Sequence, residues 1–152
     1  MNRQTCQRAT LLMVLWAATG AALAADAAAK PAVDKVSVRS TAHFDFDRAA
    51  IRPDDQSRLL AEVATMTDVT WQTVTAVGHT DSVGPTDHNR QLANRRAGAV
   101  KAFLVGKGLE ASMIQTDAKA ADLPVASNDT STGRTRNRRT EIVFQGVRAS
   151  KP

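Results

Sequence analysis

Arg96 is the residue whose position most needs a chemical explanation. It lies four residues after Leu92 and four before Val100, so helical geometry places it on a stripe of apolar side chains. A guanidinium on that stripe needs an acceptor, because desolvating it without one costs several kcal/mol. Asp81 precedes the same helix and is well placed to face Arg96 across the intervening turn. The spacing therefore predicts an acid and an arginine held close together.

Two interpretations of this pair stay open at the level of sequence. Asp81 and Arg96 form an ordinary internal salt bridge, with Asn89 fastening the loop, or they form a receptor for a zwitterion. In the second interpretation the carboxylate binds an ammonium group, and the guanidinium binds a carboxylate through two parallel hydrogen bonds. The diaminopimelic acid of Gram-negative peptidoglycan carries both groups on its free end.

Alternating strands and helices are expected to position these side chains. Helical spacing follows Pro53-Asp54-Asp55, and Gly106 and Gly108 end a second helix. The fold class that this order predicts is an α/β (α+β) sandwich of βαβαβ type, with a small mixed sheet covered by helices. The expected elements are a possible edge strand at 36–39, strands at 43–47, 71–78, 113–118 and 138–145, and helices at 53–67 and 86–105.

The amino-terminal residues have the layout of a secretory signal peptide. Arg3 and Arg8 precede an apolar run that ends in the small residues Ala22-Leu23-Ala24. We predict a signal peptide at 1–24, a tether or linker at 25–40, one binding domain at 41–147 and a tail at 148–152. The signal is either cleaved after Ala24 or retained as an anchor, and the mature chain is predicted to have no transmembrane span.

The charge and the cysteine content of the chain argue against nucleic-acid binding and against disulfide bonds. The net charge of +5 falls to +3 if Arg3 and Arg8 are removed, and no basic, aromatic-interleaved surface indicates nucleic acid. The only cysteine, Cys6, lies inside the predicted signal, so disulfides are not expected. We predict no cofactor.

An enzyme is the main competing class. His43, His79 and His88 lie near acidic residues, but their spacing matches no recognised metal-binding motif. Ser82 follows Asp81 without the glycines of a nucleophile elbow. We therefore predict neither catalysis nor a bound metal.

Several motifs in order resemble the OmpA-like carboxy-terminal domain, the family of OmpA, Pal and MotB. The resemblance runs from about Ala42 to Val147. The motifs that carry it are Phe44-Asp45-Phe46-Asp47, Gly78-His79-Thr80-Asp81-x-x-Gly84, Asn89-x-x-Leu92, Arg95-Arg96-Ala97 and Asn137-Arg138-Arg139.

The resemblance implies noncovalent binding of peptidoglycan by a periplasmic protein associated with the cell wall or outer membrane. It assigns Asp81 to the ammonium and Arg96 to the carboxylate of diaminopimelate in the stem peptide. The other pocket residues that it implies are Phe46, Asp47, Thr80, Asn89, Leu92 and Arg138.

The sequence departs from the family pattern at two places. His88 stands where the family usually has tyrosine, which predicts a different edge to the site. Ala118-Lys119-Ala120 replaces a Gly-x-Gly, and because alanine resists positive φ we expect this loop to take another path.

A protein-docking module of an envelope assembly, with weak or lost wall binding, is the alternative function. The cluster of Arg134, Arg136, Arg138 and Arg139 is the feature that supports it, with other envelope proteins as possible partners. Solvated arginines at the start of a strand are the simpler explanation of that cluster.

Overall fold

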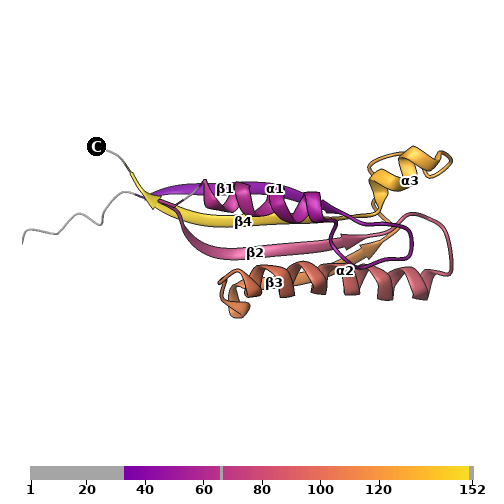
Figure 1. Cartoon of the computed structure of the whole chain (residues 1–152), viewed down its shortest axis with the longest axis horizontal. Helices are drawn as coiled ribbons and strands as arrows, with labels where there is room; N and C mark the ends of the chain where they lie inside the picture. The colour runs from indigo at the N-terminus through magenta and orange to yellow at the C-terminus, as the bar shows by residue number, and fades with distance from the viewer. Residues whose placement is uncertain (1–32, 66, 151–152) are drawn as a thin grey trace, which may run out of the picture. The chain divides into compact units, whose positions relative to one another are not determined.

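The computed structural model describes residues 33–65 and 67–150, so the predicted signal peptide and most of the predicted tether lie outside the described residues. Figure 1 shows the order of the elements along this part of the chain. They are β1 (Val33–His43), α1 (Pro53–Ala64), β2 (Thr70–His79), α2 (Thr86–Gly106), a 3-10 turn (Ala111–Met113), β3 (Ile114–Ala120), α3 (Ser131–Asn137) and β4 (Arg139–Ala149).

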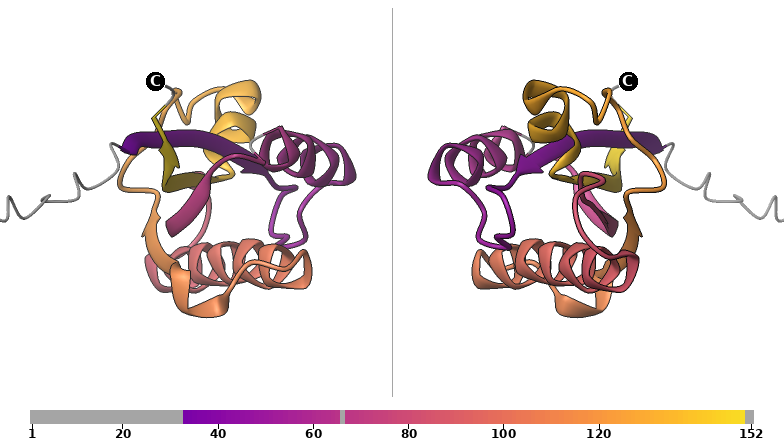
Figure 2. Two further views of the ribbon diagram at one scale, coloured as in Figure 1. Left: turned by 90° about the vertical axis from the view of Figure 1, so that its left-hand side faces the viewer. Right: turned by 90° about the vertical axis from the view of Figure 1, so that its right-hand side faces the viewer.

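The strands form one mixed sheet in the order β1-β4-β2-β3. β4 runs antiparallel to both of its neighbours, whereas β2 and β3 are parallel. Parallel neighbours need a crossover connection, and α2 supplies it. With α1, it covers one face of the sheet (Figure 2). The predicted fold class is therefore confirmed.

The hydrophobic core lies between this face and the two helices. Val74, Ile142 and Phe144 of the sheet are completely buried. Leu59 of α1 and Val100 of α2 pack against them in the same cluster. The helical stripe predicted for α2 is thus the face that the sheet covers.

Gly78 brings α2 unusually close to β2. A Cβ atom built on Gly78 would lie 2.0 Å from the carbonyl oxygen of Ala93, so no other residue fits without moving one of the two elements. Because α2 carries Asn89 and Arg96 while β2 leads directly to Asp81, this close approach also sets the distance between the two groups of polar side chains.

β1 contains the possible edge strand predicted at 36–39 and lies at the edge of the sheet, but it is longer than predicted in both directions. β1 begins at Val33 and pairs with β4 along its whole length, so the sheet starts within the predicted tether. The predicted strand at 43–47 is wrong beyond His43. The chain turns there, with the Arg48 amide donating to the Asp45 carbonyl, so Phe44 is buried while Phe46 is 59% exposed. β4 likewise runs to Ala149, into the predicted tail.

Helix α3 was not predicted. Its sequence, Ser131–Asn137, contains a glycine, which is unfavourable in a helix, and lacks the apolar stripe by which a helix is recognised in a sequence. The hydroxyl of Thr130 accepts a hydrogen bond from the Gly133 amide, so an N-cap residue marks its start. Figure 1 shows α3 at the end of the sheet where β1 and β2 also finish.

The outer edge of β1 is partly covered by side chains of α1. The carboxylate of Asp55 accepts a hydrogen bond from the His43 amide at 2.9 Å. Arg58 donates to the Thr41 carbonyl and to Asp55. Two backbone groups that point away from the sheet are therefore paired with the helix.

Candidate functional site

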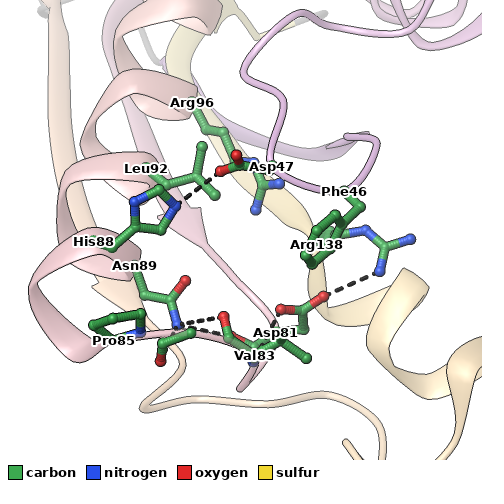
Figure 3. A pocket seen from close by; sticks show the side chains of 11 residues that line it. Phe46, Asp47, Asp81, Val83, Pro85, His88, Asn89, Leu92, Arg96 and Arg138 are labelled. Carbon is green, nitrogen blue, oxygen red and sulfur yellow. Dashed lines mark hydrogen bonds and ion pairs between the residues drawn. The ribbon is translucent and has the colours of Figure 1, made fainter.

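A cavity of about 210 Å³ opens at the end of the sheet where β1 and β2 finish. Figure 3 shows its side chains arranged around an open centre. They come from the loop after β1, the loop after β2, the first turns of α2 and the junction of α3 with β4. The lining residues are Phe46, Asp47, Asp81, Val83, Gly84, Pro85, His88, Asn89, Leu92, Arg96 and Arg138.

Seven of the eight residues predicted for the site line this cavity. Thr80 is the exception. Its backbone amide donates to the Ala120 carbonyl, and its buried hydroxyl has no hydrogen-bond partner among the described residues. Three lining residues, Val83, Gly84 and Pro85, were not predicted, and His88 was expected only to alter the edge of the site. Their position between Asp81 and Asn89 was the available signal, since a turn between two site residues necessarily runs along the site.

Arg96 is completely buried and bonded to backbone carbonyls. Its Nε donates to the Arg48 carbonyl at 2.9 Å, Nη1 to His79 at 2.9 Å and Nη2 to Asp45 at 3.1 Å. Its guanidinium also lies 5.1 Å from the centre of the Phe44 ring. Arg96 therefore holds the loop after β1 against the end of β2, and both ends of the Asp45–Arg48 turn depend on it.

Burial lowers the pKa of Arg96 to about 10, and the nearby carboxylate of Asp81 opposes that shift. Since this value is still well above neutral pH, the guanidinium keeps its positive charge in the folded protein. The cavity therefore has a permanent cation in its wall.

Asp81 forms its ion pair with Arg138, not with Arg96. Asp81 Oδ2 lies 3.1 Å from Arg138 Nη1, and Oδ1 accepts from the Val83 amide at 3.2 Å. Arg138 also donates to the Phe44 carbonyl and to the Thr135 hydroxyl. The internal salt bridge considered for Asp81 and Arg96 is thus replaced by one to an arginine 57 residues further along the chain.

Asn89 fastens the loop between β2 and α2. Its Nδ2 donates to the Val83 carbonyl at 3.1 Å, with longer contacts of 3.5 Å to the carbonyls of Asp81 and Gly84. The residue is 4% exposed. One of the two interpretations of the sequence gave Asn89 this role. These hydrogen bonds also fix the backbone that carries Asp81.

Asp47 and His88 close one side of the cavity. Asp47 adopts a left-handed φ of 53°, which aspartate tolerates better than most residues. Its Oδ1 lies 2.8 Å from Nε2 of His88 (Figure 3). The loop after β1 and the helix α2 are therefore linked across the mouth of the cavity by an exposed polar pair.

A second polar cluster lies beside the cavity. His79 is 2% exposed, and burial together with the charge of Arg139 lowers its pKa. Arg139 is buried and forms an ion pair with Glu141, which gives Arg139 a structural role. Arg134 donates to the Asn128 and Asp129 carbonyls, so Arg134, Arg138 and Arg139 of the predicted arginine cluster each have different partners.

The described residues contain no group of three or more His, Cys, Asp or Glu side chains able to hold a metal ion. None of the described helices is both long enough and apolar enough to cross a membrane. What the cavity does offer is two carboxylates and two guanidinium groups within one lining, which suits a ligand carrying both charges.

The model of the OmpA family matches residues 43–138, from the end of β1 to the arginine that pairs with Asp81. The chain belongs to the OmpA family. The match includes every residue that lines the cavity.

Several relatives of this OmpA-family chain are outer membrane proteins or peptidoglycan-associated lipoproteins. Outer membrane protein A of Bordetella avium is 42% identical over 119 residues, which cover 78% of this chain and 61% of that protein. Outer membrane porin F of Pseudomonas fluorescens is 36% identical, over 73% of this chain and 34% of the porin. The peptidoglycan-associated lipoprotein of Brucella melitensis is 32% identical, over 74% and 67%. The chain thus spans only about one to two thirds of these relatives.

Solved structures share the fold of this OmpA-family domain. The peptidoglycan-associated lipoprotein of Burkholderia pseudomallei has a TM-score of 0.60 at 23% identity, over 70% of this chain and 90% of that one. The cell wall anchor of the type VI secretion system of Pseudomonas aeruginosa has a TM-score of 0.57 at 27% identity, over 79% and 88%.

The segment Ala118-Lys119-Ala120, which replaces the Gly-x-Gly of the OmpA family, differs from the expectation. Ala120, at the second glycine of the family's Gly-x-Gly, adopts a φ of 48°. The expectation that alanine would avoid a positive φ here is therefore wrong. The Ala120 carbonyl accepts the Thr80 amide at 2.9 Å, and that bond joins β3 to the residue before Asp81. Ala120 is therefore held in a backbone conformation that is unfavourable for alanine.

Replacing Ala120 with glycine should stabilise the domain slightly. A left-handed alanine costs about 1–2 kcal/mol, most of which is offset by the greater freedom of glycine in the unfolded chain, so we expect a net gain of about 0.5 kcal/mol. Ala118→Gly is the matched control, because Ala118 has no positive φ and should lose about 1 kcal/mol. Urea unfolding of both variants measures the difference, and equal losses would show that Ala120 is not strained.

Proposed function

We propose that this domain binds peptidoglycan noncovalently in the periplasm, through the zwitterionic end of diaminopimelate in the stem peptide. The observation that carries the proposal is a cavity with two acids and two arginines in its lining. A zwitterion placed there meets an opposite charge at each of its ends, and the summed charge of these four side chains and the ligand stays zero. A relative that is a peptidoglycan-associated lipoprotein and a similar structure that is a cell wall anchor support peptidoglycan as the ligand.

In this proposal Asp81 accepts the ammonium group and Arg96 donates to the carboxylate. Three of the five N–H groups of Arg96 are bonded to carbonyls, so two donors remain. Because the side chain is completely buried, a ligand carboxylate would reach them only from within the cavity that Arg96 lines. Asp81 already pairs with Arg138, and an ammonium group would share this carboxylate with it. Phe46, Asp47, Asn89 and Leu92 would contact the rest of the stem peptide. No step in the proposal is catalytic.

The proposal predicts that Asp81→Asn abolishes most binding to diaminopimelate-type sacculi. The amide keeps the shape of the side chain but loses the charge, so we expect at least a tenfold lower affinity in cosedimentation. Competition by free diaminopimelate, but not by an N-acetylated form without the free ammonium, would indicate that the stem is recognised rather than the glycan.

Asp45→Asn is the matched control, because the side chain of Asp45 is 74% exposed and does not line the cavity. It should sediment like the wild type, and thermal melting must show that both variants are folded. A wild-type chain that stays in the supernatant would contradict the proposal and favour the docking alternative instead.

A further inference from the structure

His88 is the lining residue that departs from the family pattern, and its imidazole bonds the carboxylate of Asp47 at 2.8 Å. Both side chains are about half exposed, at 44% and 54%. A carboxylate only accepts hydrogen bonds, so in neutral His88 the proton lies on Nε2, facing Asp47.

The backbone on both sides of Asp47 is held in place. Arg96 donates to the carbonyls of Asp45 and Arg48, and the Arg48 amide closes the turn onto Asp45. Asp47 is therefore fixed at the cavity mouth, and a change at His88 alters the charge presented there more than the position of the loop.

The other charged groups of the cavity balance one another. Asp47 comes from the loop after β1, Asp81 from the loop after β2, Arg138 from the junction before β4, and Arg96 from the helix of His88 itself. The positive end of the α2 dipole also faces this region, with Asp87 in its first turn. Among these side chains, histidine is the type whose charge ordinarily changes between pH 5 and 8.

We propose that His88 is a positioning residue that clasps Asp47, and that its proton sets how strongly the cavity holds the cationic end of its ligand. This inference rests on the proposed function. Neutral His88 orients the Asp47 carboxylate and leaves its negative charge in place. Protonated His88 compensates that charge, so the ammonium group of the ligand gains less from the cavity. Binding is therefore stronger at neutral pH than at mildly acidic pH.

The test is calorimetric titration of the purified chain with free diaminopimelate between pH 5.5 and 7.5. For the wild type we expect the affinity to fall by about fivefold toward acid, the size of one partly exposed charge interaction. His88→Gln keeps an N–H donor near Asp47 but takes no proton, so its affinity should change by less than about twofold over the same range. The ionisation of the ligand is common to both titrations and cancels in the comparison.

Two further variants separate His88 from other causes. His43→Gln should keep the wild-type pH dependence, because His43 lies against Asp55 and does not line the cavity. Asp47→Asn should bind at neutral pH about as weakly as the wild type does at pH 5.5, and should lose the pH dependence. A pH dependence that persists in His88→Gln would overturn the inference while leaving the proposed function intact. A wild type that binds no diaminopimelate at any pH would overturn both.

Discussion

Arg96→Ala is expected to destabilise the domain by about 3–5 kcal/mol, more than almost any other single change on α2. The side chain is completely buried, and its removal leaves three carbonyl oxygens without the donors that now satisfy them. It also removes the stacking partner of Phe44 and a positive charge near Asp81. The turn that carries Phe46 and Asp47 would lose its attachment to the end of β2.

Urea unfolding measures this loss, and Arg95→Ala is the matched control. Arg95 precedes Arg96 on the same helix but is exposed, so its replacement should change the free energy of unfolding by less than about 0.5 kcal/mol. An Arg96→Ala variant as stable as Arg95→Ala would show that the three hydrogen bonds contribute nothing net to stability.

Gly78→Ala is expected to cost about 3 kcal/mol, although it adds only one methyl group. That methyl would lie 2.0 Å from the backbone oxygen of Ala93, and backbone atoms of a packed helix do not move aside as the end of a flexible side chain does. α2 would have to separate from β2, which also moves Asn89 and Arg96 relative to Asp81. We therefore expect weaker ligand binding as well as a lower melting temperature.

The opposite outcome is expected for Gly98→Ala, which serves as the control on the same helix. Apart from its chain neighbours and the adjacent backbone of α2, no atom of the described residues lies within 4 Å of a Cβ placed at Gly98, so the substitution brings only the higher helix propensity of alanine, about 1 kcal/mol. If Gly78→Ala and Gly98→Ala were both tolerated, the contact between α2 and β2 would be less rigid than the structure indicates.

The parts of the fold that were predicted correctly are those with a long periodic pattern. The helix predicted from Thr86 to Val105 is α2, Thr86–Gly106, because a stripe of buried positions repeats along its whole length. The strand predicted at 71–78 from its β-branched residues is β2. The strand predicted at 43–47 was wrong because alternation over five residues also describes a turn that buries one phenylalanine and exposes the next.

The site was predicted as a set of residues but not as a set of contacts. Helical spacing correctly indicated that Arg96 is buried beside Leu92. It gave no information on the acceptors, which are carbonyls of Asp45, Arg48 and His79. Backbone oxygens leave no mark in a sequence. The partner of Asp81 was missed because Arg138 reaches it only through the pairing of β4 with its neighbours.

The side chains of α1 that cover the edge of β1 have a consequence for self-association. A strand at the border of a sheet offers its outward amides and carbonyls to any other chain, which is a common route to aggregation. At Thr41 and His43 these groups are already paired with Arg58 and Asp55. This end of β1 is therefore less able to template a further strand, a useful property for a domain that would be crowded against its own copies on a polymer surface.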